Sequence, residues 1–100
     1  MTNEPNKINI NIFFMEDFLW KRELEENITA DNKDQLIRKV KDYYVDSINT
    51  VCRLLKQNPD SHYVADFEIV DCEWDKTGIT TAIIQTLDSL DEEYGKLIFP

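Results

Sequence analysis

The segment between Asn32 and Pro59 constrains the fold of this chain more than any other feature. Asn32 is a suitable N-cap for a helix, and Gln35 stands three residues later, in the position of a reciprocal capping interaction. Asn58-Pro59 ends the segment, because proline disfavours helical geometry in the residue before it. Apolar residues between these ends recur every three or four positions: Ile37, Val40, Tyr44, Ile48, Val51 and Leu55. The pattern predicts one helix of about 25 residues and roughly 37 Å, long enough to cross the whole face of a small sheet.

Two other segments have the alternation of β-strands. Lys7–Phe14 alternates cleanly, with isoleucines on one face and with asparagines and Phe13 on the other. His62–Asp75 also alternates, but its apolar set changes phase between Ile69 and Val70. A β-bulge at this point would keep one apolar face continuous, so we predict a bulged strand.

The remaining segments are less regular. Asp75–Gly78 is typical of a hairpin connection, and Ile79–Leu87 is rich in β-branched residues, so we expect an antiparallel return strand there. Asp88–Gly95 would then be a turn and Lys96–Phe99 a final short strand, although the apolar residues from Ile79 onward also fit a helical period. Met15–Asn27 fits a short helix or an ordered loop equally well.

These elements predict one α+β domain over residues 1–100, a small two-layer domain in which an antiparallel sheet of three or four strands is covered on one face by one long helix. Residues 1–6 are polar and are expected to form a disordered tail. No apolar run approaches the roughly 20 residues that span a bilayer, and the polar N-terminus does not resemble a signal peptide. We therefore expect a cytoplasmic protein, with Cys52 and Cys72 as reduced thiols in the core rather than as a disulfide.

Negative charge is concentrated in the second half of the chain. Residues 59–100 contain ten acidic and two basic side chains, a net charge of −8, whereas residues 31–58 carry a net charge of +2. Such a field attracts basic partners and repels nucleic acid and anionic membranes. With the predicted bulge, five carboxylates would project from the outer face of one strand: Asp66, Glu68, Asp71, Glu73 and Asp75. Three more would extend the acidic zone as a second patch: Asp91, Glu92 and Glu93.

This row of carboxylates has an alternative interpretation, because the outer face of a sheet must be polar and acidic side chains keep its edges soluble. The absence of basic residues from Ser61 to Asp75 favours a binding function, since a surface built only for solubility usually mixes charges. Duplex DNA carries one charge per roughly 1.7 Å, so a nucleic-acid mimic would need a second row from adjacent segments. Phe13 and Trp20 would form an interface anchor if they were exposed together, although burial is the favoured interpretation.

Few residues are suited to catalysis or to holding a cofactor. His62 is the single histidine, so neither a catalytic triad nor paired zinc ligands can be assembled, and two glycines are too few for a phosphate-binding loop. Pro59-Asp60 and Glu73-Trp74-Asp75-Lys76 resemble the magnesium-binding hairpin of restriction-type nucleases. The lysine stands one residue too far along the strand, on its opposite face, and the chain lacks the basic surface that holds DNA. We expect no enzyme, no metal and no cofactor.

Size and charge together favour a small acidic protein-binding inhibitor that occludes a basic, nucleic-acid-handling surface of a partner, such as a nuclease. Immunity proteins, antitoxins and anti-defence proteins are similar in charge and size. Such a protein would bind neither nucleic acid nor membrane directly. The first alternative is a structural or assembly subunit that self-associates, for example as a homodimer. The second alternative is the metal-dependent nuclease.

Overall fold

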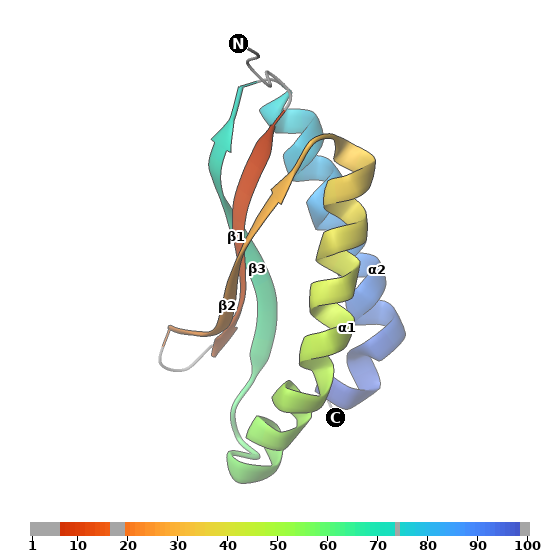
Figure 1. The fold of residues 1–100 in the computed structure, drawn as a ribbon. Coiled ribbons are helices and arrows are strands. Elements are labelled where there is room, and N and C mark those ends of the chain that lie inside the picture. The colour runs from red at the N-terminus through yellow and green to blue at the C-terminus, as the bar shows by residue number, and fades with distance from the viewer. Residues whose placement is uncertain (1–6, 17–19, 74, 99–100) are drawn as a thin grey trace.

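The computed structural model describes residues 7–16, 20–73 and 75–98, and it has the α+β architecture that the sequence predicts (Figure 1). The element order is β1 (Ile8–Glu16), β2 (Lys21–Ala30), α1 (Lys33–Gln57), β3 (Tyr63–Cys72) and α2 (Lys76–Ile98). Within the described residues the strands form one antiparallel sheet in the order β2-β1-β3. Both helices cover the same face, and of the strands α1 packs mainly against β2 and α2 against β3. The tail expected at residues 1–6 and the end of the last expected strand lie outside the described residues.

The core lies between the sheet and the pair of helices. The face of β1 that meets the helices carries fully buried side chains, as its alternation predicts: Ile8, Ile10, Ile12 and Phe14. The predicted start of α1 is confirmed, because Asn32 Oδ1 accepts a hydrogen bond from the Gln35 amide at 2.8 Å. Gln35 Oε1 in turn accepts a hydrogen bond from the Asp31 amide at 2.7 Å. The predicted stripe of α1 faces the core: Val40, Tyr44, Ile48, Val51 and Leu55 are buried, together with Leu36 and Tyr43, whereas Ile37 is only half-buried.

The predicted bulge in β3 is confirmed. The register of β1 and β3 shifts between Asn9 and Ile10, so that Val70 is an extra residue between Ile69 and Asp71. This residue restores the phase of the alternation. Apolar residues on both sides of the bulge therefore face the helices, while the carboxylates on both sides face outward.

The prediction for the C-terminal segment is wrong, because α2 replaces the hairpin at Asp75–Gly78, the strand at Ile79–Leu87, the turn at Asp88–Gly95 and the described part of the last strand. Asp75 caps this helix: its side chain accepts a hydrogen bond from the Gly78 amide at 3.2 Å. The buried side chains of α2 recur with helical spacing: Ile79, Ile83, Leu87 and Leu90. Packing of this stripe against α1 and β3 overrides the strand propensity of the β-branched residues.

The prediction for Met15–Asn27 is also corrected, because its described residues complete β1 and form most of β2. The register of β1 and β2 shifts at Phe13, which leaves Leu24 and Glu25 together opposite that residue. Leu24 has a positive φ of 59° in this irregular stretch. β2 is also an outer strand rich in charged residues, so its sequence has no continuous apolar face.

Candidate functional site

β3 places three of the predicted carboxylates on the outer face of the sheet, away from the helices. Asp66, Glu68 and Asp71 are exposed and stand opposite the outward-facing residues of β1. Glu73 is exposed directly beyond the end of β3. Asp75 is not part of this row, because it is the N-cap of α2. The row is therefore shorter than the sequence predicts.

Glu68 is held by an arginine that the sequence analysis did not single out. Arg22 of β2 reaches across β1 and contacts both carboxylate oxygens of Glu68, at 2.9 and 3.2 Å. Asn11 Nδ2 donates a further hydrogen bond to this carboxylate at 3.2 Å. These contacts lower the pKa of Glu68 to about 2, and the hydrogen bonds from Arg22 are the largest cause. Glu68 is therefore already paired within the fold.

The same arginine also lies over the ring of Phe13. The Arg22 guanidinium carbon lies 4.0 Å from the centroid of the Phe13 ring, on the outer face of the sheet. Phe13 is 2% exposed, whereas Trp20 is 76% exposed. The two aromatic residues therefore do not form a joint exposed anchor.

The other three carboxylates, Asp66, Asp71 and Glu73, form what we call the β3 acidic row. Each is exposed, and within the described residues none of them has a cation at salt-bridge distance. They are carried by one strand and its immediate extension, and hydrogen-bonded pairing with β1 holds that strand in place. The β3 acidic row is the part of the predicted ladder that the fold presents to a partner.

Amide groups occupy the outer face beside this row. Asn27 Nδ2 of β2 donates hydrogen bonds to Asn9 Oδ1 at 2.6 Å and to Asn11 Oδ1 at 2.8 Å. Beside the row, the outer face of β1 and β2 thus carries neutral amides and Arg22, and the nearby Glu25 carboxylate is paired with Arg22 at 3.1 Å. Over the described residues these contacts do not supply the second row of unpaired carboxylates that a copy of a duplex would need.

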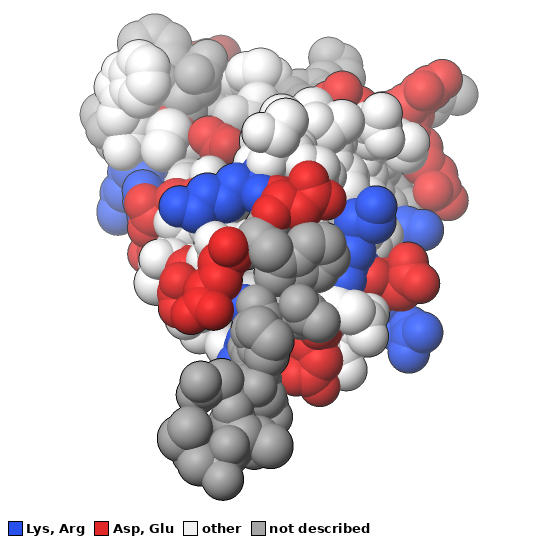
Figure 2. Space-filling view, turned by 90° about the horizontal axis from the view of Figure 1, so that it is seen from above, with Lys and Arg blue, Asp and Glu red and all other residues white. Residues whose placement is uncertain are grey.

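The second predicted patch lies on α2, in the helix layer on the other side of the sheet (Figure 1). Glu92 and Glu93 are exposed, but Asp91 is half-buried and accepts a hydrogen bond from the Tyr44 hydroxyl at 2.5 Å. The structure therefore separates the two predicted patches. Acidic and basic side chains are also interspersed on the end of the molecule where β3 stops and both helices begin (Figure 2).

Asp91→Asn is expected to increase the free energy of unfolding at neutral pH. Burial is the largest influence on Asp91 and raises its pKa, so the fold favours the protonated carboxyl group. The stabilisation of the fold by the protonated carboxyl group of Asp91 is complete below the ordinary pKa of 3.8. It is lost as the pH rises through the higher pKa of the folded state. Urea denaturation across pH 3–8 should show a gain for Asp91→Asn that disappears at the acidic end. A loss of stability at neutral pH would contradict this account.

Glu68→Gln tests the pairing with Arg22. The pKa of Glu68 is lowered in the fold, so its carboxylate stabilises the protein above its ordinary pKa of 4.5 and loses that effect as the pH falls toward 2. The difference in unfolding free energy between the wild type and Glu68→Gln should therefore narrow over this interval. It should also shrink at high salt, because the pair is partly exposed. A difference that is independent of pH and salt would show that the pair does not form.

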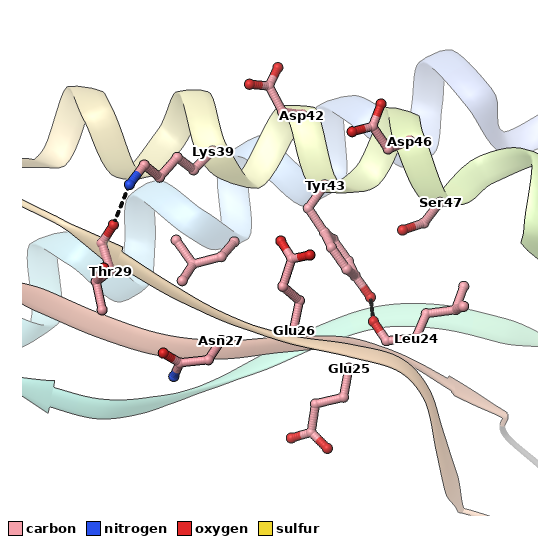
Figure 3. Close-up of a pocket in the computed structure, with 11 residues that line it drawn as sticks. Leu24, Glu25, Glu26, Asn27, Thr29, Lys39, Asp42, Tyr43, Asp46 and Ser47 are labelled. Atoms are coloured by element: carbon pink, nitrogen blue, oxygen red, sulfur yellow. Dashed lines mark hydrogen bonds between the residues drawn. The ribbon is translucent and has the colours of Figure 1, made fainter.

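A groove that the sequence analysis missed runs between β2 and α1, with a volume of about 560 Å³ (Figure 3). We call it the β2–α1 groove. Its charged lining consists of Glu25, Glu26, Lys39, Asp42 and Asp46. In Figure 3, Glu26 points into the space between β2 and α1, whereas Glu25 and Asp42 point away from it.

Two side chains of α1 cross this groove to β2. Lys39 Nζ donates a hydrogen bond to the Thr29 carbonyl oxygen at 2.6 Å, and the Tyr43 hydroxyl donates one to the Leu24 carbonyl oxygen (Figure 3). Burial is the main cause that raises the pKa of Tyr43 to about 12, so its hydroxyl is a donor at physiological pH. The i, i+4 spacing of Asp42 and Asp46 was the only signal of this groove in the sequence, because the strand opposite was not recognised.

The described residues offer little for metal or nucleophilic chemistry. Among them, no group of three or more histidine, cysteine, aspartate or glutamate side chains is arranged to hold a metal ion. Cys52 and Cys72 are not joined in a disulfide, and His62 is exposed just before β3. The hairpin that the nuclease interpretation requires is not formed, because α2 begins at Lys76.

Comparison with known proteins gave no match: no family model, no curated protein and no solved structure resembles this chain. In the part of the chain that the structure describes, no helix combines the length and the apolar character needed to cross a membrane.

Proposed function

We propose that this protein is a non-enzymatic binding domain that docks its β3 acidic row on a basic, nucleic-acid-handling surface of a partner protein and blocks that surface. Immunity proteins, antitoxins and anti-defence proteins act in this general way. We place this activity in the cytoplasm, where such partners meet their nucleic acids.

One observation carries the proposal: Asp66, Asp71 and Glu73 are exposed on one strand and its extension, and among the described residues none of the three has a cation within salt-bridge distance. Arg22, which lies on the outer face of the sheet, is already engaged by Glu68 and by Glu25. The row therefore keeps its negative charge for an external partner. An ordered anionic edge of this kind increases association rates with basic proteins and selects against acidic ones.

The row is expected to act by steric blocking rather than by imitation of a duplex. Asp66 and Glu73 are seven positions apart, which corresponds to roughly 20 Å along a bulged strand at about 3.3 Å per residue. Three charges over this length are far fewer than the phosphates of duplex DNA, which supply one charge per roughly 1.7 Å. The partner would therefore be recognised by a few placed carboxylates and by the shape of the sheet around them.

The experiment is capture followed by competition. The immobilised protein is exposed to extract from its native cell, bound proteins are identified, and each is purified. Binding of the partner to a fluorescent oligonucleotide is then measured at increasing concentrations of this protein. The proposal requires a basic partner whose apparent Kd for nucleic acid rises in proportion to the added protein. A partner that binds nucleic acid equally well in the complex would overturn it.

Self-association is a second candidate, which the topology favours. β2 and β3 are the outer strands of the described sheet, and two exposed apolar residues lie near them: Trp20 is 76% and Val70 is 52% exposed. Unpaired strand edges are templates for pairing with another chain. Sedimentation velocity at low and high salt distinguishes the candidates, because a monomer at all concentrations excludes an assembly subunit.

A further inference from the structure

The β2–α1 groove has an unpaired strand along one side. In an antiparallel outer strand, alternate residues direct their N–H and C=O groups away from the sheet. Thr29 is such a residue, because its carbonyl oxygen accepts a hydrogen bond from Lys39 of α1. Asn27, two positions earlier in β2, shares this direction by alternation. The backbone of β2 between Glu25 and Thr29 is therefore oriented to pair with one more strand.

The lining of the groove determines the charge of such a strand. Four carboxylates and one ammonium group line it: Glu25, Glu26, Asp42 and Asp46 against Lys39. Glu25 is paired with Arg22, and Asp42 points away from the groove (Figure 3), so Glu26 and Asp46 are the carboxylates that a bound strand would meet. A second copy of this chain is a poor occupant, because neither of its outer strands is basic: β2 carries three acidic and two basic residues, and β3 carries three acidic residues and no basic one. A basic segment is complementary to both walls.

We propose that the β2–α1 groove binds an extended segment of a partner protein that is rich in lysine or arginine, and that this segment adds to β2 as a further strand. Alternate side chains of the segment would face α1, where Glu26 points into the groove and Asp46 lies on the opposite wall (Figure 3). Its backbone would pair with Asn27, and one of its N–H groups would replace Lys39 at the Thr29 carbonyl oxygen. This site is on the opposite edge of the sheet from the β3 acidic row and does not depend on it.

The test uses a peptide of alternating threonine and lysine, about seven residues long at roughly 3.4 Å per residue, which spans the strand between Glu25 and Thr29. Two control peptides carry the same charge but have N-methyl groups on alternate backbone amides, in the two opposite phases. N-methylation removes the hydrogen-bond donors of strand pairing and leaves the charge intact. Binding to the full chain is followed by amide chemical shifts.

The unmodified peptide is expected to shift the amides of residues 25–29 and to bind at least tenfold more tightly than one of the methylated peptides. Glu26→Gln combined with Asp46→Asn should weaken binding several-fold, whereas Asp66→Asn combined with Asp71→Asn removes the same charge elsewhere and should not. Equal binding of all three peptides would show that charge alone, without strand pairing, accounts for the binding, and it would overturn the proposal. Failure of the unmodified peptide to bind, or shifts confined to β3, would also overturn it.

Discussion

Reversal of the three charges of the β3 acidic row is expected to abolish partner binding while the fold remains intact. The variant Asp66→Lys, Asp71→Lys, Glu73→Lys should lose at least about 100-fold in affinity, equivalent to ~2.7 kcal/mol. Each substitution replaces an attraction by a repulsion, and much of the loss of affinity should come from a slower association rate. The residues are exposed, so the free energy of unfolding should change little. Surface plasmon resonance with the captured partner measures the loss, and urea denaturation verifies the fold.

A matched variant separates position from net charge. Asp88→Lys, Glu92→Lys, Glu93→Lys makes the same change in net charge on exposed residues of α2, in the helix layer. This variant should retain affinity within a few-fold at physiological salt, because charges on the far layer are largely screened over more than about 8 Å. Equal losses in both variants would mean that the partner responds to overall charge, and the docking proposal would then fail.

Phe14→Ala is expected to have the largest effect on stability. Phe14 is fully buried in β1, and its ring centroid lies 5.3 Å from that of Tyr44 and 6.0 Å from that of Tyr43. Removal of the ring leaves a cavity between the sheet and α1, which typically costs about 3–5 kcal/mol. Domains of this size have a total stability of only about 5–15 kcal/mol, so the variant would lose a large fraction of its stability. Urea denaturation followed by circular dichroism measures the loss.

Val70→Thr is the control for this substitution. Val70 is the 52% exposed residue of the β3 bulge, and threonine preserves its shape and its strand propensity. Its free energy of unfolding should stay within about 0.5 kcal/mol of the wild type. A loss below about 1 kcal/mol for Phe14→Ala would contradict the burial of this ring in the core.

The elements whose pattern is local could be predicted from the sequence. The capping residues and the apolar stripe of α1 determine that helix, and the alternation of Lys7–Phe14 determines β1. The phase change at Val70 identified the bulge in β3, because a strand with one buried face has a strict period of two. In these cases each residue's own neighbours in the sequence indicate which side faces the core.

The elements that depend on distant contacts could not be predicted. α2 contains strand-forming residues whose propensity competes with its helical apolar period, and packing against α1 and β3 decides in favour of the helix. The pairing of Glu68 with Arg22 joins residues 46 positions apart across β1, so charge counted along the sequence overstated the free acidic surface. The β2–α1 groove could not be predicted either, because one of its walls is β2. The bulge in β2 hides the alternation that would identify this segment as a strand.

The most direct measurement is carboxylate labelling of the protein alone and in complex with its captured partner, followed by mass spectrometry of its peptides. We expect Asp66, Asp71 and Glu73 to be labelled in the unbound protein and protected in the complex, with Glu92 and Glu93 labelled equally in both. Protection of the α2 carboxylates, with the β3 acidic row still labelled, would show that the partner binds the helix layer and would contradict the proposed docking surface.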